Sequence, residues 1–188
     1  MKNLMLTLAA AATFSMTACN SGDDKKDPKE VAETKNEAKM DNTPMENDAE
    51  FVTDVADGGM LEVKLGELAK TKAGSPAVKD LAAMLVTEHT KANNELAEAA
   101  RKNNISMATG LSADNQKKYD DLAAKTGAAF DKAYTDLLKS AHEKTIKKLE
   151  DEIANGHNAD VKAWATATLP VIKHHAEMVV QVYDKVHK

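Results

Sequence analysis

Apolar residues return every three or four positions through most of residues 49–188. This spacing places them on one face of an α-helix, as expected for helices packed against one another. Breaks are predicted at Gly74-Ser75-Pro76, where serine can cap a helix and proline suits its first turn, and at Asn155-Gly156. The predicted helices cover residues 49–72, 76–102, 112–125, 128–154 and 159–187. Four long helices and a short connecting helix predict an all-α four-helix bundle.

The first 19 residues predict an export signal. Lys2 supplies a short cationic start, residues 4–14 are mostly apolar, and Met16-Thr17-Ala18-Cys19 ends the segment. That tetrad is similar to the lipobox of bacterial lipoproteins, in which the cysteine thiol receives a diacylglycerol, so Cys19 is the predicted lipidation site. A plain signal peptide with an incidental cysteine is the alternative. The apolar run is too short for a permanent membrane-spanning helix.

Lipidation would hold the mature chain in the cell envelope of a Gram-negative bacterium, with the membrane as its first partner. Asn20 rather than an aspartate follows the cysteine, which indicates the outer membrane under the enteric sorting rule. We therefore expect an outer-membrane lipoprotein that faces the periplasm or the cell surface.

Residues 20–48 differ in composition from the rest of the chain. They contain five lysines against nine acidic residues, few apolar side chains, and prolines at Pro28 and Pro44. A charged segment with little apolar surface cannot form a core of its own. The pattern predicts a disordered acidic linker between the lipid anchor and a bundle domain at residues 49–188.

Composition and charge exclude several classes of protein. A single cysteine rules out a disulfide framework and any multi-cysteine zinc or iron–sulfur site. A formal net charge of -5 is the wrong sign for a nucleic-acid binder, so we expect no nucleic-acid partner. The sequence contains no glycine-rich phosphate loop, no Gly-x-Ser-x-Gly elbow and no His-Glu-x-x-His. We therefore expect a protein that binds rather than an enzyme.

Four polar residues occupy positions where the helical pattern calls for apolar ones. They are Glu62, His89, His142 and His175, one on each long helix, and all fall near the middle of the predicted bundle. Three imidazoles and one carboxylate in an apolar core are able to hold one divalent transition metal, such as Zn, Cu or Fe. The alternative is a structural layer in which the same groups hydrogen-bond to one another.

Three further residues are secondary candidates for this site. His174 and Met178 adjoin His175 and would favour copper if they faced the core, while Tyr134 could complete a polar layer.

Several stretches of the sequence resemble a bacterial family of exported helical proteins, a domain of unknown function often labelled as outer-membrane proteins. The matching stretches are Gly58-Gly59-Met60-Leu61-Glu62-Val63, residues 88–96, Phe130-Asp131-Lys132-Ala133-Tyr134 with His142, and Leu169-Pro170 with His175. The resemblance implies a ferritin-like four-helix fold and an envelope location, and it matches the four polar core positions. It implies no reaction.

These observations predict a lipid-anchored envelope protein that acts by binding, as a binding or envelope-stress module with an unknown ligand or envelope protein partner. A metal-binding or redox-protective protein with a mononuclear site in the bundle core is the alternative.

Overall fold

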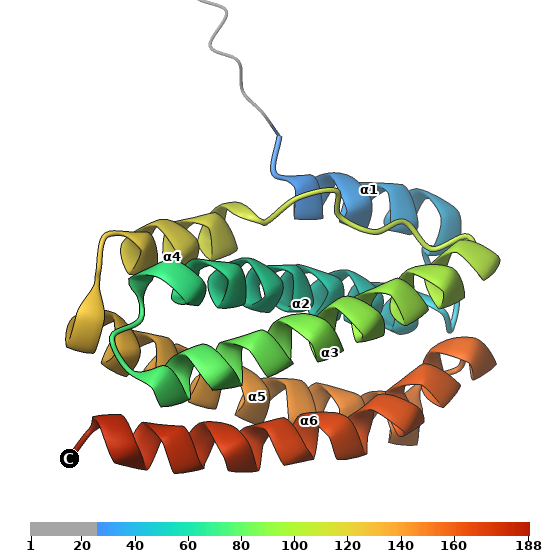
Figure 1. Ribbon diagram of the computed structural model, residues 1–188. Helices are drawn as coiled ribbons and strands as arrows, with labels where there is room; N and C mark the ends of the chain where they lie inside the picture. The colour runs from blue at the N-terminus through green and yellow to red at the C-terminus, as the bar shows by residue number, and fades with distance from the viewer. Residues whose placement is uncertain (1–25) are drawn as a thin grey trace, which may run out of the picture.

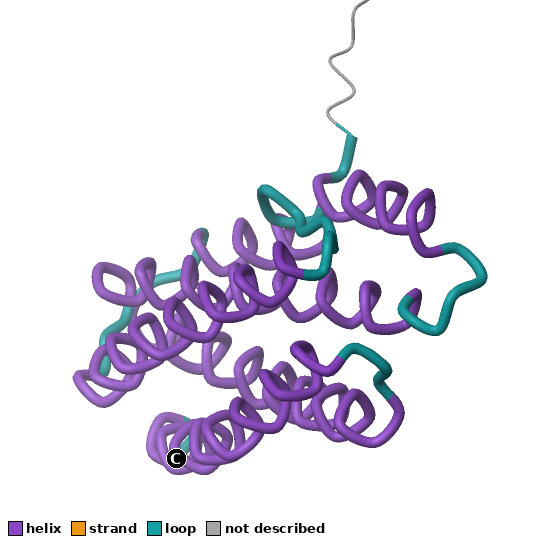
Figure 2. Tube along the Cα trace, turned by 90° about the vertical axis from the view of Figure 1, so that its right-hand side faces the viewer, coloured by secondary structure: helices purple, strands orange, loops and turns teal. Residues whose placement is uncertain are grey.

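The computed structural model describes residues 26–188, which form six α-helices (Figure 1). The helices are α1 (Pro28–Met40), α2 (Glu46–Lys72), α3 (Pro76–Lys102), α4 (Ala113–Ala123), α5 (Gly127–Asn155) and α6 (Ala159–Val186). Figure 2 shows no strand among the residues it colours. The prediction of an all-α bundle with four long helices and a short connecting helix is confirmed. None of the helices in this part of the chain is long and apolar enough to cross a membrane.

The bundle consists of two hairpins, α2–α3 and α5–α6, whose helices also pack across the bundle as α2 on α5 and α3 on α6. The connection from α3 to α5 is long and contains α4, which lies on α2. Figure 1 shows α1 and α4 along the same side of α2. Because α5 begins beside the α2–α3 turn, with Gly127 bridged to Ala73, α3 and α5 run in the same direction. A bundle with one long crossover is a known arrangement of ferritin-like folds.

Each hairpin holds the turn of the other through a buried aspartate. Asp131, near the start of α5, accepts hydrogen bonds from the backbone amides of Gly74 (3.1 Å) and Ser75 (2.8 Å) in the α2–α3 turn. Asp48, near the start of α2, accepts hydrogen bonds from the amides of His157 (3.0 Å) and Asn158 (2.7 Å) in the α5–α6 turn. Both aspartates are buried, so these turns are satisfied by charged acceptors rather than by water.

The apolar core divides into two clusters along the bundle axis. One cluster lies toward the α2–α3 turn and includes Leu65, Leu85, Phe130, Leu138 and Val179. The other lies toward the α5–α6 turn and includes Val52, Leu96, Leu149, Trp164 and Ile172. On every long helix, the polar residue singled out from the sequence lies where the chain passes from one cluster to the other.

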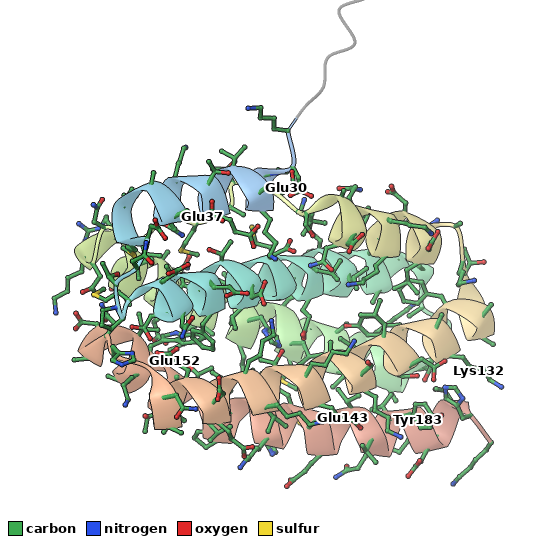
Figure 3. All side chains as sticks on the ribbon, turned by 180° about the vertical axis from the view of Figure 1, so that it is seen from behind. Glu30, Glu37, Lys132, Glu143, Glu152 and Tyr183 are labelled. Atoms are coloured by element: carbon green, nitrogen blue, oxygen red, sulfur yellow. The ribbon has the colours of Figure 1, made fainter. Side chains whose placement is uncertain are left out.

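The predicted disordered linker is wrong over residues 28–48, because this segment forms α1 and the start of α2. The side chain of Asp27 caps α1 by accepting a hydrogen bond from the amide of Lys29 at 2.8 Å, and Pro28 occupies the first turn, where proline is favourable rather than disruptive. Figure 3 shows Glu30 and Glu37 on this helix. Residues 1–25, and with them the predicted signal and Cys19, lie outside the described part of the chain.

Helix α1 packs on α2 through residues spaced by four. Ala32, Asn36 and Met40 are buried. The amide group of Asn36 donates to the carbonyl of Ser106 (2.9 Å) and its oxygen accepts from the amide of Ser106 (2.7 Å), which ties α1 to the loop after α3. The apolar stripe of α1 is therefore short and has a polar residue at its centre. For this reason the sequence pattern showed a charged segment and no helix that could pack.

Candidate metal centre

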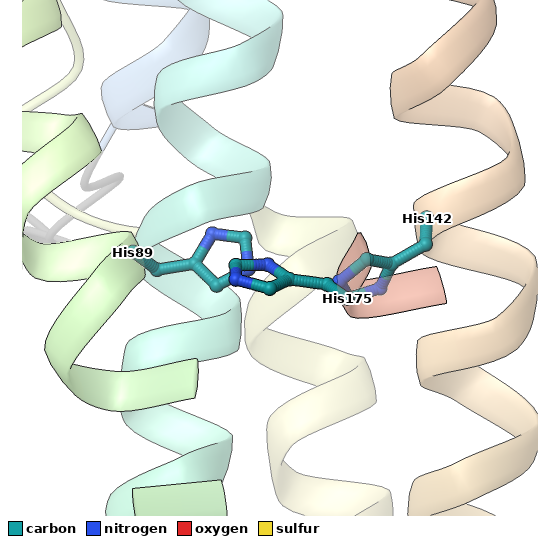
Figure 4. Close-up of side chains that lie close together, drawn as sticks. All are labelled: His89, His142 and His175. Atoms are coloured by element: carbon teal, nitrogen blue, oxygen red, sulfur yellow. The ribbon is translucent and has the colours of Figure 1, made fainter. Parts of the chain in front are cut away.

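The four predicted core residues meet at the centre of the bundle, each from a different helix. Glu62 comes from α2, His89 from α3, His142 from α5 and His175 from α6. Their exposed fractions are only 4%, 5%, 0% and 1%. Figure 4 shows the three imidazole rings converging. They meet at the same level along the bundle axis because each occupies a core-facing position near the middle of its helix.

The distances within this centre are short. Ring centroids lie 5.6 Å apart for His89 and His142, 5.1 Å for His89 and His175, and 5.7 Å for His142 and His175. One nitrogen from each ring lies within 4.8 Å of the other two. Glu62 Oε2 lies 2.9 Å from His89 Nε2 and 3.6 Å from His142 Nε2. The centre thus contains three imidazole nitrogens and a carboxylate oxygen in one small volume.

Two of the imidazoles are oriented by a hydrogen bond from their outer nitrogen. His142 Nδ1–H donates to the backbone carbonyl of Leu138 at 2.9 Å, because a carbonyl can only accept. His175 Nε2 lies 2.7 Å from Glu88 Oε2 and donates to that carboxylate. In the neutral rings, the remaining nitrogens, His142 Nε2 and His175 Nδ1, therefore carry lone pairs. Such an outer hydrogen bond is typical of metal-binding histidines, whose tautomer it fixes.

The inner atoms of the centre do not satisfy one another. Among the described residues, six buried side-chain polar atoms lack a hydrogen-bond partner, and four of them belong to this centre. They are Glu62 Oε2, His89 Nε2, His142 Nε2 and His175 Nδ1. Glu62 Oε2 and His89 Nε2 are close enough for an ion pair, but their angles are not those of a hydrogen bond. A structural polar layer would hydrogen-bond all of these atoms to one another, and here only Glu62 and His89 lie in close contact.

Charge in the centre is concentrated on Glu62. Burial alone would raise the pKa of Glu62, but His89, His142 and His175 outweigh burial and lower it to about 2. Burial works against a charged His89, yet the Glu62 carboxylate raises the pKa of His89 above its ordinary value. Burial lowers the pKa of His175. Glu62 is therefore ionised, and its carboxylate favours a positive charge beside it, either on a protonated His89 or on a bound cation.

The donor set fits a divalent transition metal. Zn²⁺ binds imidazole nitrogen at about 2.0–2.1 Å, which places the nitrogens of a tetrahedral site about 3.4 Å apart. The three nitrogens here lie within 4.8 Å of one another, so they would need to approach by at most about 1.4 Å, a shift that side-chain rotation can supply. Imidazole suits Zn, Cu and Fe, and one carboxylate offsets part of the ion's charge.

The three secondary candidates, His174, Met178 and Tyr134, lie in different surroundings. His174 is exposed, so His175 is the imidazole that faces the core. Met178 is partly buried and packs against the apolar cluster that contains Leu65, not against the three imidazole rings. Tyr134 is fully buried and stacks on Phe130, with ring centroids 5.6 Å apart. Its hydroxyl has no hydrogen-bond partner, and burial and the Glu62 charge raise its pKa.

Glu88 is a functional candidate that the sequence did not indicate. It directly precedes His89, and the helical rotation of about 100° per residue turns it away from the centre and toward α6. There its carboxylate reaches His175. Only the packing of α3 against α6 reveals this role, because the two residues are 87 positions apart.

An all-α bundle with a buried histidine–glutamate centre is the class of protein that this geometry defines. The chain belongs to the family of the domain of unknown function DUF4142, whose model matches residues 31–182. That match covers most of the chain and begins within α1. No curated protein and no solved structure matches the chain.

Proposed function

We propose that this bundle binds one divalent transition-metal ion through His89, His142, His175 and Glu62. The observation that carries the proposal is the set of four buried polar atoms that meet at one point without forming a hydrogen-bonded layer. Leaving one such atom without a partner costs about 1–3 kcal/mol. A bound ion removes this cost for all four atoms at once, since it accepts the three nitrogen lone pairs and the carboxylate oxygen.

Binding, rather than catalysis, is the role we propose for the bundle, with the ion as its ligand. The three imidazoles lie between two apolar clusters. Metal handling or redox protection in the envelope would follow from such a site, because an enclosed ion is withheld from solution and from side reactions.

We also propose that the bundle is attached to the envelope by a lipid on Cys19. The support for this is the sequence of residues 1–19 alone, with its cationic start, apolar run and lipobox-like end. Mass spectrometry of the mature N-terminus should find a diacylated cysteine, and Cys19→Ser should move the protein from the membrane to the soluble fraction. A Cys19→Ser protein that stays in the membrane fraction would contradict the lipid anchor.

Elemental analysis of the untagged chain purified from membranes tests the metal proposal. The expected result is close to one equivalent of a single transition metal, lost when His89, His142 and His175 are all changed to alanine. His174→Ala is the matched control, because His174 is exposed on the same helix as His175, and it should retain the metal. A wild-type chain that is free of metal and takes up no Zn, Cu or Fe would refute the proposal and leave a structural polar layer.

A further inference from the structure

A large cavity opens beside the candidate metal centre. Its volume is about 700 Å³, and residues of α1, α2, α4 and α5 line it. Its apolar lining includes Leu61 of α2 and Leu137 and Ala141 of α5. Both α1 and α4 lie on α2, so the segment predicted to be a linker forms part of the cavity wall.

Glu62 connects this cavity with the imidazoles. Its side chain lines the large cavity and also a second, much smaller one that His89 lines. The same carboxylate lies 2.9 Å from His89 Nε2. Among the four residues of the centre, Glu62 alone lines the large cavity. A cation in the cavity therefore meets a ligand of the centre without passing through the apolar clusters.

The lining of the cavity is acidic. Seven carboxylate side chains and four lysines line it, which leaves an excess of three negative charges. Lys29 pairs with Glu33 and Asp54, and Lys148 pairs with Asp54, so these ion pairs occupy two carboxylates as well as two lysines and leave the excess negative charge on the other lining carboxylates. Figure 3 labels Glu30 at the end of α1 nearest α4. A concave surface with excess negative charge raises the local concentration of cations.

The smaller cavity offers no comparable path. Its volume is about 20 Å³, about the space of a single water molecule. Trp164 lines it, and the indole N–H of Trp164 donates to the carbonyl of Ala92 at 3.1 Å, which fixes the ring across this side of the bundle.

We infer that the large acidic cavity is the access route of the metal: divalent cations collect at its carboxylates, and Glu62 passes them to His89 and His142. The inference rests on the proposed function, because it requires the ion to bind at the centre. The ligand class is a hydrated divalent cation. Its water ligands would be replaced stepwise, first by oxygen atoms of the cavity lining and then by the imidazole nitrogens.

Gly58→Leu tests the route by narrowing the cavity. Gly58 lines the cavity, and a Cβ placed there meets no atom within 4 Å, so a side chain can start at this position without a clash and improves the helix propensity of α2. Stopped-flow mixing of Zn²⁺ with the metal-free full chain gives the rate of uptake, and transfer to excess chelator gives the rate of release. Both rates should fall by the same factor with an unchanged Kd, because an obstacle on the route raises the barrier to uptake and to release equally.

Ala83→Leu is the matched control, since Ala83 is exposed on α3 away from the cavity. Its two rates should equal those of the wild type. If Gly58→Leu also has wild-type rates, or if it loses affinity with an unchanged uptake rate, the access route is refuted. A wild-type chain that binds no Zn²⁺ at equilibrium refutes the proposed function instead, so the two failures are distinct.

Charge provides a second, independent test. The double variant Glu30→Gln, Asp114→Asn removes two carboxylates of the cavity lining. It should slow uptake several-fold at low salt, with little effect at high salt, because screening removes the attraction in both proteins. The control Glu98→Gln, Asp184→Asn removes two exposed carboxylates elsewhere. Equal uptake rates for the two double variants would overturn the inference.

Discussion

Glu88 gives the sharpest test of the proposed metal centre, because its variants separate an effect on metal binding from an effect on folding. Its carboxylate accepts a 2.7 Å hydrogen bond from His175 Nε2, yet 41% of the Glu88 side chain is exposed. His175 itself is buried, so removing the Glu88 carboxylate leaves its Nε2–H without an acceptor and costs about 1–3 kcal/mol of folding free energy. The same hydrogen bond fixes the His175 tautomer that presents Nδ1 as a ligand.

Loss of an outer hydrogen-bond partner typically weakens metal binding about 10–100-fold. Glu88→Ala should therefore raise the Kd for Zn²⁺ by that factor, which corresponds to about 1.4–2.8 kcal/mol. Glu88→Gln keeps an acceptor but loses the charge, so its Kd should lie between those of the alanine variant and the wild type. Competition titrations with a chromophoric chelator measure these constants.

The thermal stability of the metal-free protein separates this role from a structural one. Glu88→Gln should leave the metal-free Tm close to that of the wild type, because its amide oxygen can still accept the hydrogen bond from His175 Nε2. Glu95→Gln is the control, because Glu95 lies on the same helix with an exposed side chain and a long 3.8 Å ion pair to Lys91; it should change neither quantity. If Glu88→Ala lowers the metal-free Tm strongly while Kd stays within twofold of wild type, the reasoning is refuted.

Three further predictions concern pH, the turns and the metal itself. Burial and Asp48 raise the pKa of Glu152 to about 7 from its ordinary 4.5. The folded state therefore keeps a proton that the unfolded state has released, so the free energy of unfolding should fall as the pH rises from about 4.5 to about 7 and then level off. Glu152→Gln should remove this contribution in urea titrations at pH 5 and pH 8; an unaltered pH dependence would contradict it. Asp131→Ala should lower the free energy of unfolding by about 1–3 kcal/mol, measured by chemical denaturation, because the amides of Gly74 and Ser75 lose their acceptor. Zn²⁺ at 100 times its Kd should raise the free energy of unfolding by about 2.7 kcal/mol, and a shift of the same size in the variant without the three core histidines would place the ion elsewhere.

The four long helices were predictable from the sequence because each carries a repeated apolar face of many residues. The same repeat exposed the candidate ligands, since a histidine such as His142 at a core position interrupts an otherwise apolar series. The pattern also left His174 and His175 undecided. Packing resolves that choice, because neighbouring residues differ by about 100° around a helix and only one of them can face the core.

The features that the sequence did not predict depend on contacts between distant segments. Helix α1 is stabilised by its contact with α2 and by the pair of hydrogen bonds between Asn36 and Ser106, which are 70 positions apart. Glu88 gains its role from α6. The acidic cavity exists only because α1 and α4 both lie on α2. Composition describes a segment by itself, and a charged segment with three buried positions looks the same as a disordered one.

The paired aspartates Asp48 and Asp131 have a consequence for the metal centre, although both lie far from it. A helix that slid by one residue relative to its neighbours would move its ligand by about 1.5 Å along the axis and turn it by about 100°. Asp131 is 11 residues from His142 and Asp48 is 14 residues from Glu62, so these two ligands sit about 16 Å and 21 Å from the aspartates on their own helices. Each aspartate accepts hydrogen bonds from the turn of the other hairpin, and these hydrogen bonds set the axial register of the helices. The relative positions of the four candidate ligands are thus determined at the two ends of the bundle, and under the proposed function substitutions there are expected to alter metal affinity without changing a ligand.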